Sequence, residues 1–261
     1  MDLDPRLAAL RPLGGFFVLR TTANTGAAPA GPLPALAQAY ADTASDPRLN
    51  ALAARVGAVA HRLRTPEPRV SASIVHQGLA ARLWSAALGC AALYGRLPDL
   101  DPALLLWDFA ATAPDDLWLT EVRPHPRDPY PTDAGTLADA VLHGHLEPLA
   151  KALRTRYGVA TGLLWGNAGS ALAGAARLLD RWARVNGRTD VADRTLTLTA
   201  ALLTHPLLST TGTLTGTGFR RRSCCLYYRV PGGGVCGDCC FPRPPALPRG
   251  PHLGDHGGPA M

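Results

Sequence analysis

The sequence predicts a mainly α-helical body with a few short strands, followed by a small cysteine-rich loop near the C-terminus. Three observations support this fold class. The 261 residues are 47% hydrophobic and 18% charged, which fits one soluble globular domain with a small appendage. Apolar residues recur at helical spacing over most of the stretch 46–208. Five of the six cysteines lie between Cys224 and Cys240.

The first 45 residues carry little regular pattern. Residues 14–22 (GGFFVLRTT) are expected to form a strand, and the Ala-, Gly- and Pro-rich stretch 23–34 a loop. A helix is expected from Asp46, because an aspartate followed by proline is a typical helix start. The apolar residues that follow, spaced three and four apart, are Leu49, Leu52, Val56, Val59 and Leu63. Prolines 66 and 68 then end this helix.

A second helix is expected over about 71–94. Its apolar stripe consists of Val75, Leu79, Leu83, Ala87, Cys90 and Tyr94. A second face, with small and polar side chains, consists of Gly78, Arg82, Ser85 and Gly89. Small residues permit the close approach of another helix or of a ligand, so this face is a candidate binding surface.

Further elements follow along the chain. Residues 117–122 (LWLTEV) are expected to form a strand, and a helix over 136–157 should break at Pro148. Asn167 is expected to cap another helix, because asparagine is a preferred N-cap residue. The side chains expected on the outward face of that helix are Ser170, Arg177, Arg181 and Arg184. A Thr-rich helix is expected over 191–208.

The composition changes after Ser209, which divides the chain into three predicted parts. Residues 1–209 form the helical body, and residues 210–241 form the cysteine segment, which begins with a Thr- and Gly-rich linker. Residues 242–261 are rich in Pro, Gly and His. This tail lacks the apolar residues of a core, so it is expected to be disordered.

Charge and hydropathy exclude several classes of protein. The net charge is +6, but 25 of the 26 basic residues are arginines spread along the chain, with a single run at Arg220–Arg222. Without a basic stripe interleaved with aromatic residues, nucleic-acid binding is not expected. No stretch of eighteen apolar residues occurs, so no membrane span is expected. Asp2 and Asp4 precede any cation, and no signal-peptide cleavage site follows, which favours a cytoplasmic protein.

The cysteine segment is the most informative motif. Its spacing is CC-x10-C-x2-C, formed by Cys224, Cys225, Cys236 and Cys239, and Cys240 is an additional thiol. A C-x2-C pair is a chelating half-site, and clustered thiols in a reducing compartment favour metal over disulfides. Residues 226–230 are expected as a short strand. The adjacent cysteines depart from zinc-ribbon spacing, and structural zinc and an iron–sulfur cluster both remain open on spacing alone.

Other candidate residues carry weaker signals. His143 and His145 lie two apart on a helix and face different ways, so they are not expected to share a metal. Cys90 lies on an apolar stripe and is expected to be a buried thiol. His252 and His256 lie in the tail and are expected to be solvated. The chain contains no GxSxG or HExxH motif and no GxGxxG after a strand, so no residue is predicted to act as a nucleophile or a general base.

The run RRSCCLYYRVPGGG, followed by C-G-x-C, resembles the C-terminal 2Fe–2S motif of FhuF-like ferric-siderophore reductases of the actinobacterial type. The resemblance continues in 71–98 and 166–179 and covers about 45–240. It implies that four thiols ligate one 2Fe–2S cluster. These implied ligands are Cys224, Cys225, Cys236 and Cys239. Cys240 stands where no ligand is expected, so it is either a bystander or a competitor for Cys239.

The resemblance also implies a reaction and its partners. Siderophores bind Fe(III) through hard oxygen donors and hold Fe(II) far more weakly, so one electron releases the metal. The implied activity is therefore the one-electron reduction of a ferric-siderophore complex in an iron–sulfur oxidoreductase. No flavin or nicotinamide motif is present. An external electron donor, such as a ferredoxin or a nicotinamide-dependent reductase, is therefore expected.

Two other function classes stay open beside this one. The first is a zinc-stabilised binding module without redox activity. The second is a 2Fe–2S redox sensor, which usually carries a DNA-binding element, and no helix-turn-helix signature is visible. The run Arg220–Arg222 also has two interpretations. It is either solvated charge, or a group of cations that raises the cluster potential or docks an acidic ferredoxin or an anionic ferric complex.

Overall fold

The computed structural model describes residues 4–29, 31–41, 50–127 and 129–245. It confirms a mainly helical fold with a few short strands. The helices, in chain order, are α1 (Asp4–Ala8), α2 (Thr22–Thr25), α3 (Leu36–Ala41), α4 (Ala51–Leu63), α5 (Pro68–Tyr94), α6 (Ala134–Leu137), the π-helical segment η3 (Ala138–Leu146), α7 (Glu147–Tyr157), α8 (Thr161–Val185) and α9 (Thr189–Leu203). The strands form two antiparallel pairs, β1 (Leu105–Trp107) with β2 (Leu117–Leu119) and β3 (Gly212–Thr215) with β4 (Gly218–Arg221).

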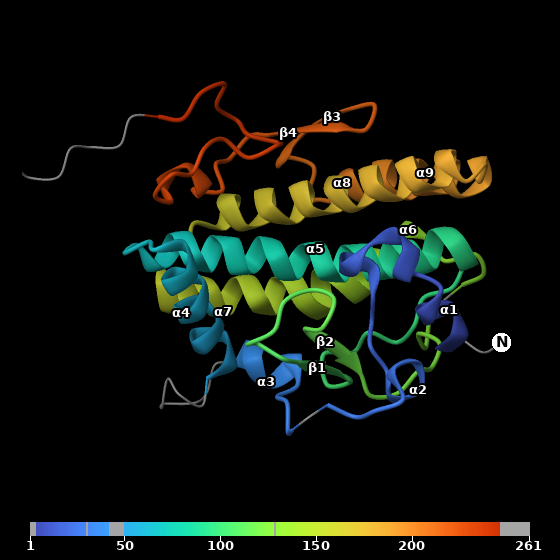
Figure 1. Cartoon of the computed structure of the whole chain (residues 1–261). Coiled ribbons are helices and arrows are strands. Elements are labelled where there is room, and N and C mark those ends of the chain that lie inside the picture. Colours follow the sequence, from blue (N-terminus) through green and yellow to red (C-terminus); the bar gives the residue numbers. More distant parts are fainter. Residues whose placement is uncertain (1–3, 30, 42–49, 128, 246–261) are drawn as a thin grey trace, which may run out of the picture.

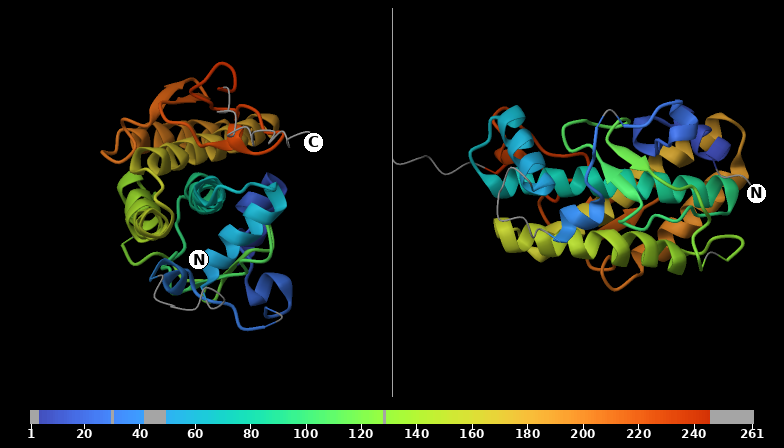
Figure 2. Two further views of the ribbon diagram at one scale, coloured as in Figure 1. Left: turned by 90° about the vertical axis from the view of Figure 1, so that its left-hand side faces the viewer. Right: turned by 90° about the horizontal axis from the view of Figure 1, so that it is seen from below.

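Helix α5 runs through the middle of the molecule (Figure 1). It packs against α8 along one side and against α4 on another. The β3–β4 hairpin lies over α8, and the β1–β2 pair lies on the opposite side of α5 (Figures 1 and 2). The apolar stripe of α5 is therefore covered, and nearly all residues from Leu79 to Ala92 are buried. Because α5 is enclosed over most of its length, polar side chains on it do not mark a solvent-facing side.

The ends of α4 and α5 have clear local causes. Helix α4 begins after Asn50, whose side chain accepts a hydrogen bond from the Ala53 N–H at 2.9 Å. The predicted start at Asp46 lies outside the described residues. The helix ends at Arg64, which adopts the left-handed conformation with φ 51°. Pro68 then opens α5 at the first helical position, where its missing N–H costs nothing.

Helix α8 corrects one expectation. It begins at Thr161, six residues before the predicted cap, and Asn167 is buried inside it. The Asn167 side-chain amide donates to the Ser73 carbonyl at 2.9 Å and to the Ser73 hydroxyl at 3.1 Å. Asparagine disfavours a helix interior when its side chain competes for the local backbone. Here distant groups satisfy the side chain, so the helix continues through it.

The short elements differ most from the sequence-based expectations. Residues 14–22 do not form a strand. They contain the 3-10 turn Gly15–Phe17 and the start of α2, and only Arg20 makes an isolated bridge, to Trp118. The predicted strand 117–122 is confirmed but shortened to β2. These segments pair over three or four residues at most, too few to produce an alternating pattern.

Three further differences concern the second half of the chain. The helix predicted over 136–157 is confirmed, but the predicted break at Pro148 does not occur, because the backbone stays helical where the π-helix passes into α7. The predicted linker 210–218 instead forms β3 and the start of β4. The strand expected over 226–230 is a 3-10 turn, Tyr227–Arg229.

No helix in the described part of the chain is long and apolar enough to cross a membrane. The prediction of a disordered tail concerns residues that lie, from 246 onward, outside the described ones.

Candidate metal centre

Two glycines of α8 let the β3–β4 hairpin lie directly on this helix. A Cβ atom added to Gly169 would lie 2.5 Å from the Thr211 hydroxyl oxygen and 3.3 Å from the Phe219 ring. A Cβ atom added to Gly166 would collide with the Ser223 hydroxyl. Real Cβ atoms do not approach other atoms so closely, so the start of the cysteine segment fits α8 only because these two positions lack a side chain.

The alternation of strand β4 separates the three consecutive arginines. Arg221 faces inward and is only 2% exposed, whereas Arg220 and Arg222 are exposed. The Arg221 guanidinium donates to Asn167 Oδ1 on α8 at 2.5 Å and to Gln77 Oε1 on α5 at 3.3 Å. The interpretation of the run as solvated charge is therefore wrong for Arg221. Its side chain joins both central helices to the cysteine segment.

The first cysteine pair is held against the start of α5. The Cys225 carbonyl accepts a hydrogen bond from the buried Ser73 hydroxyl at 2.8 Å. Leu226 follows in the left-handed conformation with φ 68°, and its N–H donates to Cys224 Sγ at 3.2 Å. Adjacent residues of a regular strand project to opposite sides. The backbone reversal at Leu226 removes that regularity directly after the pair.

Asp238 anchors the second cysteine pair. It lies inside the C-x2-C turn, which the Cys239 N–H closes onto the Cys236 carbonyl at 3.1 Å. Its carboxylate is 8% exposed, accepts a hydrogen bond from the Ser170 hydroxyl at 2.6 Å and pairs with Arg177 at 3.2 Å. The expectation that Ser170 points outward is therefore wrong, because the C-x2-C turn covers it.

The thiols of the two pairs act on one another. A hydrogen bond from Cys236 lowers the pKa of Cys225 to about 6, and the same bond raises the pKa of Cys236, which keeps the shared proton. Burial raises the pKa of Cys224 to about 11. The positive charge of Arg221 lowers the pKa of both Cys225 and Cys236. The two halves of the motif, separated by ten residues, therefore lie side by side.

The donor set fits a 2Fe–2S cluster. All the cysteines are free thiols, and backbone N–H groups point at two of the sulfurs, the second being Cys239 Sγ, 3.4 Å from the Phe241 nitrogen. Hydrogen bonds of this kind stabilise thiolate ligands of iron–sulfur clusters. Within the described residues, no group of three or more histidine, cysteine or acidic side chains is gathered closely enough to hold a metal ion. The segment nevertheless carries five thiols, and a 2Fe–2S cluster held by cysteines requires four.

A cavity of about 350 Å³ lies between α5 and α8 and is bounded by the C-x2-C turn. This cluster-side cavity includes, among its lining residues, Gln77, Ser85, Ser170, Gly174, Cys236 and Asp238. Ser85 of α5 and Ser170 of α8, both singled out in the sequence, therefore meet there on facing helices. Gly89 does not, because it packs against the ring of Phe17, which a Cβ atom at Gly89 would approach to 3.0 Å.

The histidines and the remaining cysteine lie elsewhere. His143 is exposed and pairs with Glu147, while His145 is buried and hydrogen-bonds to Tyr40 at 2.9 Å. They do not converge, as expected from their spacing. Cys90 is buried in α5, which raises the pKa of its thiol to about 12. The functional residue that sequence reasoning missed is Asp238. Its position between the two cysteines of the C-x2-C pair was the feature of the sequence that could have pointed to it.

Comparison with known families agrees with this geometry. Residues 77–211 match the model of the ferric iron reductase FhuF-like transporter family, and residues 221–241 match the FhuF 2Fe–2S C-terminal domain. The first match covers just over half of the chain. The chain belongs to the FhuF-like family. Its cofactor is a 2Fe–2S cluster, and its general function is that of a ferric iron reductase. No curated protein matches the chain.

Membership of the FhuF-like family settles one alternative. The second match, residues 221–241, includes all five clustered cysteines, and it describes a 2Fe–2S domain. The zinc-stabilised module considered from spacing alone is therefore set aside.

Proposed function

We propose that this protein is a ferric-siderophore reductase whose substrate, a ferric complex, binds in the cluster-side cavity. The supporting observation is that the C-x2-C turn forms one wall of this cavity, which Cys236, Gly237 and Asp238 line directly. The 2Fe–2S cluster, when bound, supplies the single electron that converts Fe(III) to Fe(II). The external donor is oxidised by one electron in each cycle, and the weakly held Fe(II) leaves the siderophore.

We further propose that Cys224, Cys225, Cys236 and Cys239 are the cluster ligands, with Cys240 outside the set. The hydrogen bonds to the sulfurs of Cys224 and Cys239 support this set, as does the contact between Cys225 and Cys236. In the same scheme, residues 1–209 form the body that holds the ferric complex. Residues 210–241 then form the segment that carries the cluster.

The side chains of the cluster-side cavity suit a bulky chelate. Alanines of α5 and α8 form an apolar wall that excludes water, the lining alanines being Ala81, Ala171 and Ala175. Ser85 and Gln77 offer hydrogen bonds to the ligand oxygens. Arg177 is half-buried, and its charge is partly balanced by Asp238. The cavity beside the cluster favours a reductase over a redox sensor, which needs no substrate site.

The outer face of the cysteine segment fits an acidic electron donor, such as a ferredoxin. Three large apolar side chains of the segment are exposed, Tyr227, Val235 and Phe241. Three exposed cations accompany them, Arg220, Arg222 and Arg243. Apolar contact surrounded by positive charge favours a partner whose surface is acidic. Reduction by such a donor should therefore slow as salt is added.

An anaerobic iron-release assay tests the proposed function. The purified holoprotein is reduced, mixed with a ferric-siderophore complex, and Fe(II) is trapped by a coloured chelator. We expect one Fe(II) for each reduced cluster, with the visible spectrum of the oxidised cluster returning in step. The same protein stripped of its cluster should release no Fe(II). A reduced cluster that every ferric complex leaves reduced would contradict the proposal.

A further inference from the structure

The ring of Phe16 lies between two cavities. It lines the cluster-side cavity, and it also lines a second cavity of about 280 Å³ between α4, α5 and the β1–β2 loop. This second cavity, called here the α4-side cavity, includes Arg55, Val59, Arg62, Gly78 and Trp107. Among the described residues, Phe16 alone lines both. Its side chain is 43% exposed, whereas the neighbouring Phe17 is completely buried.

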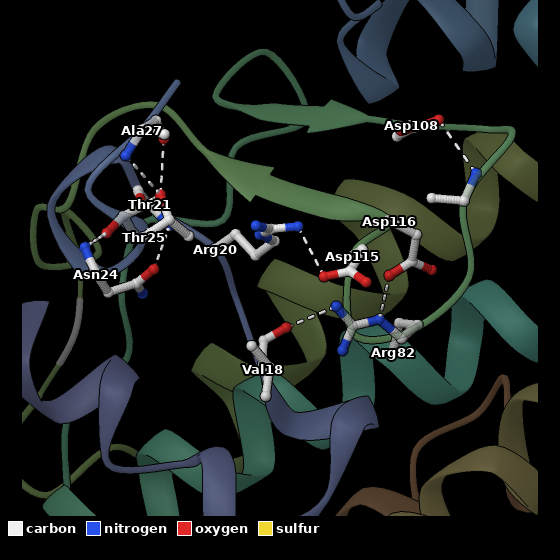
Figure 3. A network of polar contacts seen from close by, with 11 residues as sticks. Val18, Arg20, Thr21, Asn24, Thr25, Ala27, Arg82, Asp108, Asp115 and Asp116 are labelled. Carbon is white, nitrogen blue, oxygen red and sulfur yellow. Dashed lines mark hydrogen bonds and ion pairs between the residues drawn. The ribbon is translucent and has the colours of Figure 1, made fainter. Parts of the chain in front are cut away.

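The backbone around Phe16 is fixed by a buried ion pair. Arg82 of α5 donates to the carbonyl oxygens of Gly15 and Phe16. It also donates to the Val18 carbonyl at 2.6 Å (Figure 3). Its Nε atom lies 2.8 Å from Asp116 Oδ1, and both charged side chains are buried. Loss of either partner would leave a buried charge without its counter-charge, so this contact is held firmly.

The contrast between backbone and ring is informative. Four hydrogen bonds from Arg82 hold the main chain and the Asp116 carboxylate, and Phe17 anchors the turn in the core against Gly89. The Phe16 ring is therefore the movable part of a fixed turn. Aromatic side chains have only two rotatable bonds, so a rotation about them sweeps a defined path between the two cavities.

The lining of the α4-side cavity suits it to hold part of a ligand that is bound in the cluster-side cavity. It is mainly apolar, with Arg62 exposed beside Val59 and Leu63. Gly78 contributes no side chain, and a Cβ atom added there would meet nothing within 4 Å. The small-residue face of α5 thus opens into this cavity at Gly78 and into the cluster-side cavity at Ser85.

We propose that Phe16 sets the size of the ferric complex that the protein accepts. This inference rests on the proposed reductase function. The ring separates the cavities, so a compact complex fills the cluster-side cavity alone. A bulkier complex needs the ring to turn aside, and part of its organic ligand then occupies the α4-side cavity. Phe16 is in this role a specificity-determining residue.

Binding of ferric complexes that differ in size tests the proposal. The probes are the compact ferric tris(acetohydroxamate) and ferric tris(catecholate), each compared with the ferric complex of a hexadentate ligand of the same donor type. Calorimetry on the oxidised holoprotein gives the ratio of the two dissociation constants. We expect Phe16→Ala to shift this ratio toward the bulky complex by about tenfold, and Phe16→Trp to shift it the other way.

Three controls make the result decisive. Tyr130→Ala removes an exposed aromatic ring that lines neither cavity and should leave the ratio unchanged. The visible spectrum and melting temperature verify each variant, and Phe16→Leu replaces Phe16→Ala should the latter not fold. An unchanged ratio in all Phe16 variants, with both complexes bound by the wild type, would overturn the role of Phe16 alone. A wild type that binds no ferric complex would refute the proposed function, and the inference with it.

Discussion

Arg221 is the cation placed to act on the cluster. Its neighbours Arg220 and Arg222 lie in solvent, where salt screens their charge. Arg221 is buried, is held by Asn167 and Gln77, and already lowers the pKa of Cys225. A buried charge is screened far less than an exposed one, so the influence of the arginine run on the metal centre is concentrated in one residue.

Replacing Arg221 with Gln should lower the reduction potential of the cluster. A cation stabilises the reduced state, which carries one more negative charge. A tenfold change in a one-electron equilibrium corresponds to about 59 mV, and we expect a shift of this order. Protein-film voltammetry at low and high salt measures it. Arg222→Gln, the exposed cation next in the chain, is the matched control and should shift the potential little. Equal shifts in both variants would refute the special role of Arg221.

Single Cys→Ser variants test the proposed ligands. Substitution at Cys224, Cys225, Cys236 or Cys239 should bleach the visible spectrum or shift it strongly, because an alcohol is a poorer ligand than a thiolate. Cys90→Ser, deep in α5, and Cys240→Ser should retain the spectrum and the iron content. Loss of the cluster in Cys240→Ser together with its retention in Cys239→Ser would reverse the assignment of these two neighbours.

Among the elements, the contact between α8 and the β3–β4 hairpin depends on glycine, which makes it testable. Gly169→Ala places a Cβ atom against Thr211 and Phe219, so the hairpin must move outward. We expect a lower melting temperature and a reduced cluster content. Gly162→Ala on the same helix is the matched control, since a Cβ atom there meets nothing within 4 Å. Gly162 lies in the first turn of α8, so alanine there should gain less than the roughly 0.5–1 kcal/mol of a helix interior and should leave the cluster content unchanged. Unchanged cluster content in Gly169→Ala would show that the hairpin accommodates the methyl group.

The sequence predicts long elements better than short ones, for a physical reason. Helices α4, α5 and α9 repeat their apolar spacing over several turns, so their existence is readable from sequence. Strands β1 and β3 span only three or four residues and exist because a partner strand lies beside them. The start of α8 was misplaced because the usual cap residue, Asn167, serves a contact with Ser73, 94 positions away.

The same distinction holds for the metal centre. The cysteine spacing is local, so it identified the segment directly. The groups that hold the segment in place are not local, since Ser73 reaches the Cys225 carbonyl across 152 positions and Ser170 reaches Asp238 across 68. Such contacts depend on how α5 and α8 pack, which a single sequence does not display. The small-residue faces were visible in the sequence, and their meeting in one cavity was not.

At the scale of the whole molecule, a buried histidine joins distant parts of the body. His145 of η3 accepts a hydrogen bond from the Tyr40 hydroxyl at Nδ1, and its Nε2–H donates to the Leu100 carbonyl at 2.6 Å. A carbonyl can only accept, which fixes the neutral tautomer with the proton on Nε2. Burial lowers the pKa of His145 to about 4. A second buried histidine, His76, has its pKa lowered to about 3 by burial and by Arg221.

Stability should therefore fall with acidification. Both histidines stay neutral in the folded protein, while in the unfolded chain they take up a proton below pH 6.5. The free energy of unfolding should decrease as the pH drops from 6.5 toward 4, by about 3 kcal/mol for His145 alone. Urea titrations followed by helical circular dichroism at several pH values measure this slope. His145→Gln, which cannot titrate, should have a visibly shallower slope, and an identical slope would refute the assignment.

The platform beneath the cysteines has a consequence for how the protein matures in the cell. Helices α5 and α8, with Ser73, Asn167 and Ser170 on their facing sides, precede Cys224 in the chain. Synthesis proceeds from the N-terminus, and early segments fold while later ones are still being made. The surface of α5 and α8 on which the cysteine segment packs can thus form before Cys224 leaves the ribosome. Holding the cluster would then require only that residues 210–241 fold onto a surface that is already assembled.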